Sequence, residues 1–132
     1  MQPQRERESY YPITAALAAT DGERIEISFN DPLHGENSVT SKGHSQKRTV
    51  TTKTLDTIMA VFGDRKIDLL KIDIEGHGAE ALKGGQATLS RTHQILFETH
   101  NETEISEAVD IIMGSNFRIR GMRSRTLIFE RR

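Results

Sequence analysis

Charged and imidazole side chains gather where two apolar runs of this sequence end. The five residues concerned are Lys71, Asp73, Glu75, Glu98 and His100. Side chains two residues apart share one side of a strand, and charges on a buried strand are costly unless they are paired or reach solvent. In an open parallel sheet, ligands bind beyond the carboxyl ends of the strands. We therefore expect a functional cleft here, in which carboxylates and an imidazole could act as general acids and bases.

The same residues also allow purely structural explanations. Lys71 could pair with Asp73 and do nothing more, and Glu75 could simply favour the positive end of a following helix. His77, between Gly76 and Gly78, is more often an exposed bystander than a substrate contact. The glycines fit neither common phosphate-binding pattern, so we interpret them as permitting a tight strand-to-helix turn.

The elements that would position these side chains form an α/β pattern. The expected elements are a strand at 67–74, a helix along 79–89, a strand at 94–99, a helix at 105–113 and a hairpin of 117–121 with 126–130. The first strand is almost continuously apolar, which is typical of a strand covered on both faces of a parallel sheet. A strand–helix–strand unit predicts parallel pairing with a right-handed crossover, and 101–104 resembles a helix-capping box.

The N-terminal half is less regular. We expect residues 1–10 to form a flexible tail and 11–132 to form the domain. Within it, 11–18 and 24–29 flank a Thr-Asp-Gly turn signal and predict a β-hairpin. The polar stretch 30–46 predicts a loop, and 47–53 a short strand. A helix should start after the N-cap Thr54 and end at Gly63.

Composition narrows the functional classes. The 132 residues suit one domain, with 35% hydrophobic and 28% charged residues and a net charge of -1. This balance predicts no attraction to nucleic acid or to an anionic membrane, and no apolar run approaches the roughly 18–20 residues of a membrane span. There is no cysteine, which excludes disulfides and thiolate metal sites and suits a reducing cytoplasm.

Several short motifs, in order, resemble the FkbM family of methyltransferases over roughly residues 12–130. The matching segments are Thr54-Leu55-Asp56, Ile67-Asp68-Leu69-Leu70, Lys71-Ile72-Asp73-Ile74-Glu75-Gly76, Leu82-Lys83-Gly84 and Leu96-Phe97-Glu98, with weaker matches at Ala15-Ala16-Leu17 and Asn37-Ser38-Val39. Where the family has a second acid, this chain has Gly78, with Glu80 two residues later.

The resemblance implies a partial class I, Rossmann-like sheet of parallel strands with helices and a C-terminal antiparallel hairpin. It also implies S-adenosylmethionine as methyl donor and O-methylation of a small-molecule or sugar hydroxyl. Asp73 or Glu75 would deprotonate the acceptor, helped by Glu98 or His100, while Lys71 and His77 would bind substrate. The family's glycine-rich donor turn has no counterpart in residues 1–11, so we expect a domain truncated at its N-terminus.

Alternatives to this reading remain open. By analogy with metal-using catechol methyltransferases, Asp73 and Glu98 could hold a divalent cation. The methyltransferase interpretation itself requires no metal. The domain could instead be a non-catalytic remnant or interaction module, with a second copy of the chain covering exposed sheet. A metal-dependent hydrolase using the Asp-x-Glu pair is a third interpretation, but the sequence has no recognisable histidine cluster for it.

Overall fold

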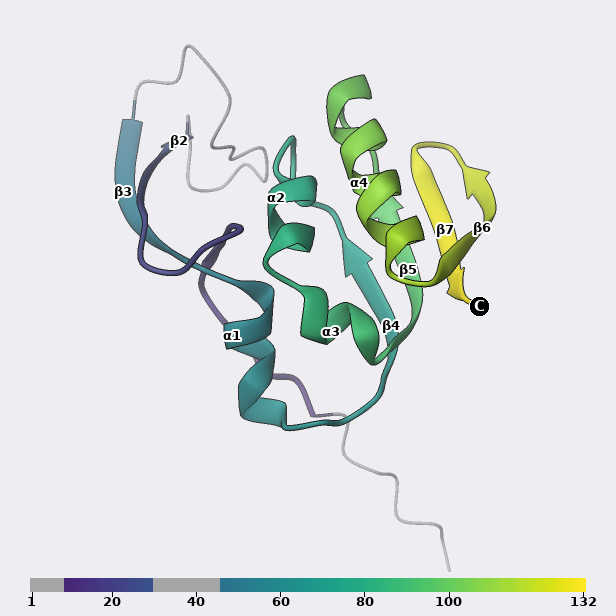
Figure 1. The fold of residues 1–132 in the computed structure, drawn as a ribbon. Helices are drawn as coiled ribbons and strands as arrows, with labels where there is room; N and C mark the ends of the chain where they lie inside the picture. The colour runs from purple at the N-terminus through teal and green to yellow at the C-terminus, as the bar shows by residue number, and fades with distance from the viewer. Residues whose placement is uncertain (1–8, 30–45) are drawn as a thin grey trace, which may run out of the picture.

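A computed structural model of the chain describes residues 9–29 and 46–132. They form a mixed α/β fold with two separate sheets, one of three strands and one of four (Figure 1). The predicted tail falls mostly, and the predicted loop at 30–46 almost entirely, outside the described residues. Within the described part, no helix combines the length and apolar character that a membrane crossing would need.

The larger sheet carries the predicted strand–helix–strand unit. Its strands are β4 (Ile67–Ile72), β5 (Thr92–Glu98), β6 (Phe117–Arg123) and β7 (Thr126–Arg131). The strand order is β4-β5-β7-β6, with β4 and β5 parallel and β7 antiparallel to both of its neighbours. The parallel pair and the C-terminal hairpin are therefore confirmed, and the last strand is inserted between β5 and β6.

Three helices cover one face of this sheet (Figure 1). They are α2 (Gly78–Lys83), α3 (Gln86–Ser90) and α4 (Glu102–Gly114). Between the helices and the strands lies one apolar core, whose largest fully buried side chains are Phe97, Phe117, Phe129, Leu82, Leu89, Ile95 and Ile112. Burial of this surface is the main free-energy gain available to the domain.

The prediction that 67–74 is covered on both faces was wrong for the described part of the chain. Leu69, Gln94, Glu130 and Arg118 pair in one row across the sheet, and every one of them keeps contact with solvent. Within residues 9–29 and 46–132, β4 is an edge strand whose one partner is β5, and Leu69 is 51% exposed. A nearly continuous apolar run therefore does not by itself distinguish a central strand from an edge strand.

The smaller sheet corrects the predicted N-terminal hairpin. β1 (Ala16–Leu17) and β2 (Arg24–Phe29) do not pair with each other, because β3 (Gln46–Lys53) lies between them. β3 is parallel to β1 and antiparallel to β2. The buried Thr52 hydroxyl donates to Thr20 O and accepts from Glu23 N, which fixes the intervening turn to β3 rather than letting β1 fold onto β2.

The helix after β3 follows its sequence signals. Its segments are α1 (Leu55–Met59) and the 3₁₀ turn η1 (Ala60–Phe62). Thr54 is the N-cap, since its hydroxyl accepts from Thr57 N, and Gly63 ends the segment with φ 64°, a backbone conformation that glycine adopts without strain.

The predicted helix at 79–89 is divided into α2 and α3 at Gly84-Gly85, which corrects that prediction. A Cβ at Gly84 would lie 2.4 Å from Ala18 O, so the backbone here packs directly against the end of β1. The carboxylate of Asp56 caps the first turn of α3, because it accepts hydrogen bonds from Ala87 N at 2.9 Å and Thr88 N at 2.7 Å. Asp56 of the Thr-Leu-Asp motif therefore has a structural role.

Candidate active site

The sheet places the predicted site residues side by side. Ile72 pairs with Phe97 near the ends of the parallel strands β4 and β5, so Asp73 and Glu98 leave the sheet next to each other. His100 follows two residues after β5. Since parallel strands end at the same edge, their final side chains converge without any further loop structure.

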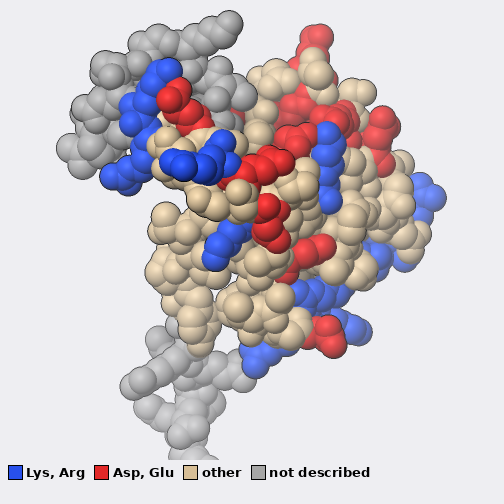
Figure 2. All heavy atoms as spheres, turned by 60° about the vertical axis from the view of Figure 1, so that its left-hand side comes forward, with Lys and Arg blue, Asp and Glu red and all other residues tan. Residues whose placement is uncertain are grey.

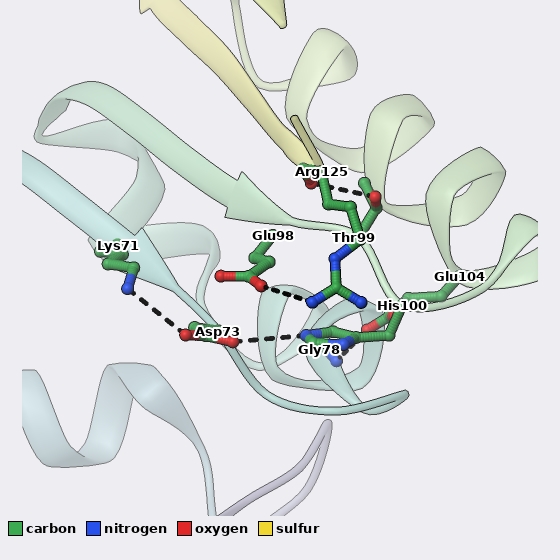
Figure 3. A network of polar contacts seen from close by, with 8 residues as sticks. All are labelled: Lys71, Asp73, Gly78, Glu98, Thr99, His100, Glu104 and Arg125. Atoms are coloured by element: carbon green, nitrogen blue, oxygen red, sulfur yellow. Dashed lines mark hydrogen bonds and ion pairs between the residues drawn. The ribbon is translucent and has the colours of Figure 1, made fainter. Parts of the chain in front are cut away.

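Asp73 lies between two nitrogen groups (Figure 3). His100 Nε2 is 3.3 Å from Asp73 Oδ1, and Lys71 Nζ is 3.3 Å from Asp73 Oδ2. Desolvation alone would raise the pKa of Asp73, but hydrogen bonds and charge attraction from Lys71 and His100 outweigh it and hold this pKa below its ordinary value. Asp73 is therefore a carboxylate at neutral pH, able to accept a hydrogen bond from a hydroxyl group.

Glu98 has a partner that the sequence analysis did not single out. Arg125 Nη2 lies 3.5 Å from Glu98 Oε1. The backbone position of Arg125 is fixed because its carbonyl accepts from both the amide and the hydroxyl of Thr99, at 2.8 and 3.0 Å. The antiparallel insertion of β7 brings the hairpin turn to this edge, because Thr126 pairs with Glu98. Arg125 could have been predicted beside Glu98 only if this register of β7 on β5 had been known.

Glu75 and His77 lie elsewhere, in the turn between β4 and α2. Neither belongs to the group formed by Asp73, Glu98 and His100. β4 ends at Ile72, so the alternation predicted along one side of the strand stops before Glu75. Gly76, with φ 70°, then turns the chain between Glu75 and His77. The His77 Nε2 atom is buried and has no hydrogen-bond partner within the described part of the chain.

A buried carboxylate that sequence reasoning assigned only to helix capping holds this turn in place. Asn101 caps α4 by accepting from Glu104 N at 2.8 Å, as predicted. The Glu104 side chain, however, accepts from Gly78 N at 2.6 Å. A Cβ at Gly78 would meet Phe97 at 2.7 Å and Glu104 Oε1 at 2.9 Å, so the absence of a side chain lets the turn approach α4.

Glu80, the acid that follows Gly78 at the family position, faces a lysine instead of the site. Lys83 forms ion pairs with Glu80 of α2 and with Glu107 of α4. Hydrogen bonds from Glu107 and Glu80 raise the pKa of Lys83 to about 12. The pair of contacts links α2 to α4 at the surface, so Glu80 does not replace an acid in the site.

An apolar cavity of about 310 Å³ adjoins Asp73. It lies between β1, α1, α2 and the end of β4, and its lining residues are Leu17, Leu55, Leu70, Lys71, Ile72, Asp73, Ile74 and Ala81. Acidic and basic side chains lie close to each other over the face of the molecule seen in Figure 2. Within the cavity lining, Asp73 supplies a carboxylate and Lys71 an ammonium group, and the other residues form an apolar wall.

This arrangement can do two kinds of chemistry. The Asp73–His100 pair can accept and pass on a proton from a hydroxyl, and Asp73, Glu98 and His100 each offer an atom that could bind a metal ion. A methyltransferase FkbM domain model matches residues 2–121. Comparisons with curated proteins and with solved structures gave no match. Because the family match spans most of the chain, this protein belongs to the FkbM methyltransferase family.

Proposed function

We propose that this chain carries the acceptor side of an S-adenosylmethionine-dependent O-methyltransferase with a class I, Rossmann-like sheet. The acceptor would be a hydroxyl of a small molecule or a sugar. The observation that carries the proposal is the Asp73–His100 pair beside the apolar cavity, 3.3 Å apart at the carboxyl ends of two parallel strands. Family membership supplies the reaction class.

The acceptor side of the reaction needs a hydroxyl held in line and relieved of its proton. In the proposed arrangement the acceptor hydroxyl donates a hydrogen bond to Asp73, which takes its proton, and His100 holds the carboxylate through Oδ1. The Lys71 ammonium, at the other carboxylate oxygen, would hold a polar group of the acceptor. The proposed contact of His77 with substrate and a share of Glu75 in deprotonation stay predictions.

The residues that line the cavity can be compared with the groups that the methyl donor would present to them. S-adenosylmethionine has an adenine, a ribose and an amino-acid group, and supplies an electrophilic methyl on sulfur. Apart from Lys71 and Asp73, the described cavity residues present aliphatic side chains. These suit an aromatic ring but not the ribose hydroxyls and the amino-acid group together.

Calorimetric titration of the purified chain with S-adenosylmethionine and with its demethylated product tests the proposal. Micromolar binding of both would mean that residues outside this cavity complete the donor site, and transfer of a labelled methyl group to a panel of small-molecule and sugar alcohols would then support the proposed activity. A folded chain that binds neither compound would rule out methyl transfer by this polypeptide.

Asp73→Asn provides the matching catalytic test. We expect turnover to fall by about 10²–10⁴-fold, the usual contribution of a positioned general base, with the affinity for the methyl donor little changed. Asp68→Asn, an exposed aspartate of the same strand, is the control and should keep normal turnover. Equal turnover of the two variants would contradict the role proposed for Asp73.

The uncovered edge of β4 favours a second candidate function, that of an interaction module formed by two copies of the chain. Among the residues that the structure describes, β4 pairs with β5 alone, and the side chain of Leu69 on this strand is 51% exposed. Unpaired strand edges readily accept another chain. Light scattering after size-exclusion chromatography should then show a dimer that Leu69→Lys dissociates, whereas a monomer at all concentrations would exclude this function.

A further inference from the structure

Three potential metal ligands converge at the end of the larger sheet. Asp73, Glu98 and His100 each provide one atom, and these atoms all lie within 4.8 Å of one another (Figure 3). We propose that these three side chains bind one divalent transition-metal cation. The site coincides with that of the proposed function, so a catalytic use of the cation rests on that function, whereas its binding does not.

The spacing of two of the ligand atoms already suits a metal ion. Ligands that bind one ion octahedrally, at about 2.1 Å and at right angles, lie about 3 Å apart. His100 Nε2 and Asp73 Oδ1 are separated by 3.3 Å. The Glu98 side chain is 23% exposed, and its ligand atom already lies within 4.8 Å of the other two.

The cations that now face these carboxylates hold them weakly. Lys71 is 3.3 Å from Asp73, with 57% of the lysine side chain exposed, and Arg125 is 3.5 Å from Glu98, with 69% of the arginine side chain exposed. Long ion pairs in solvent contribute little to stability. A divalent ion with direct oxygen contacts would therefore displace them at small cost.

The donor set indicates the class of metal. Two carboxylate oxygens suit Mg²⁺ and Mn²⁺, imidazole nitrogen suits later transition metals, and no thiolate is present to select a soft ion. Mn²⁺ accepts both donor types. Three protein ligands also leave coordination positions for water or for acceptor oxygens, whose pKa the ion would lower. An acceptor with two neighbouring oxygen atoms would fit such a site best.

The test uses binding of Mn²⁺ to the chain, measured at neutral pH by loss of the free-ion electron paramagnetic resonance signal. We expect one site per chain, with affinity at least 10-fold weaker in Asp73→Asn and in Glu98→Gln. Asp110→Asn, which removes an exposed aspartate of α4, should bind as the unchanged chain does. Circular dichroism would verify that every variant is folded.

Arg125→Gln gives a prediction of opposite sign. Removing a positive charge beside Glu98 should strengthen Mn²⁺ binding about 3-fold or more, because it removes a competitor for the carboxylate and a like charge near the ion. The proposal would be overturned if the unchanged chain failed to bind Mn²⁺, or if Asp73→Asn and Glu98→Gln bound Mn²⁺ as tightly as the unchanged chain does. Since the readout is metal binding alone, a chain that binds Mn²⁺ but transfers no methyl group would refute only the proposed function.

Discussion

At the scale of single residues, the turn after β4 requires glycine at position 78 for lack of space rather than for backbone freedom. Gly78 has no unusual φ among the backbone exceptions, which include Gly76. Its requirement is steric, because Phe97 and Glu104 occupy the space that a Cβ would need. The close approach lets its amide reach the buried Glu104 carboxylate, and this contact fixes the segment that follows Asp73.

Gly78→Ala should therefore destabilise the fold by about 1–3 kcal/mol, the usual cost of overpacking a tight site. Denaturant unfolding would measure the loss. Gly114→Ala, in α4 and with no atom within 4 Å of the added Cβ, is the matched control and should be neutral or stabilising by up to about 1 kcal/mol. Equal effects of the two substitutions would show that the contacts at Gly78 are not restrictive.

At the scale of elements, two aspartates join segments that lie far apart in the sequence. Asp21 accepts from Thr54 N and from the Thr57 hydroxyl, both at 2.7 Å, and so attaches the turn before β2 to the start of α1. Asp56 of α1 accepts from the first turn of α3. Helix ends have unpaired amides that need such acceptors.

Asp56→Ala should lower the free energy of unfolding by about 1–2 kcal/mol, as expected when a helix cap is lost. Thermal or urea unfolding would measure it. Asp64→Ala, at an exposed position just after η1, controls for loss of a negative charge and should change stability by less than about 0.5 kcal/mol.

Asp21 makes a pH-dependent contribution. The hydrogen bonds from Thr57 and Thr54 lower the pKa of Asp21 in the folded chain. A depressed folded pKa gives stability that is present above the unfolded pKa and is lost as the pH falls through the folded pKa. Asp21→Asn should therefore lower Tm at pH 7, with a difference that shrinks below about pH 4. Asp110→Asn controls for the removed charge, and a Tm difference independent of pH would contradict the explanation.

At the scale of the whole molecule, the larger sheet has two unlike faces. The row that contains Ile95 and Phe129 packs under the helices, where both are fully buried, while the adjacent row through Leu69 and Gln94 is exposed. Most of the buried apolar contacts therefore lie on one face of the sheet. The polar side chains at the edge where β4 and β5 end lie outside this core.

Phe129→Ala should cost about 3–5 kcal/mol, the usual loss for a fully buried phenylalanine. Ile128→Ala, the neighbouring residue on the opposite face and only partly buried, should cost clearly less. Guanidinium unfolding of both variants checks the difference, and similar losses would mean that the other face of the sheet is also covered in solution.

The sequence by itself determined the local elements and which polar side chains follow the two parallel strands. The spacing of apolar residues and the helix-capping signals predicted β4, β5, α4 and the C-terminal hairpin. The positions of Asp73, Glu98 and His100 at the ends of two parallel strands predicted that these side chains would lie close together. These features depend on neighbours along the chain and on the common direction of parallel strands, both of which the residue pattern contains.

Only the tertiary structure decided which segments pair across long separations. The insertion of β3 between β1 and β2, the division of the helix at Gly84, the arrival of Arg125 at Glu98 and the attachment of Glu104 to Gly78 all depend on long-range packing. Such contacts are selected by the total burial and hydrogen bonding of the whole chain, so no local period or motif encodes them.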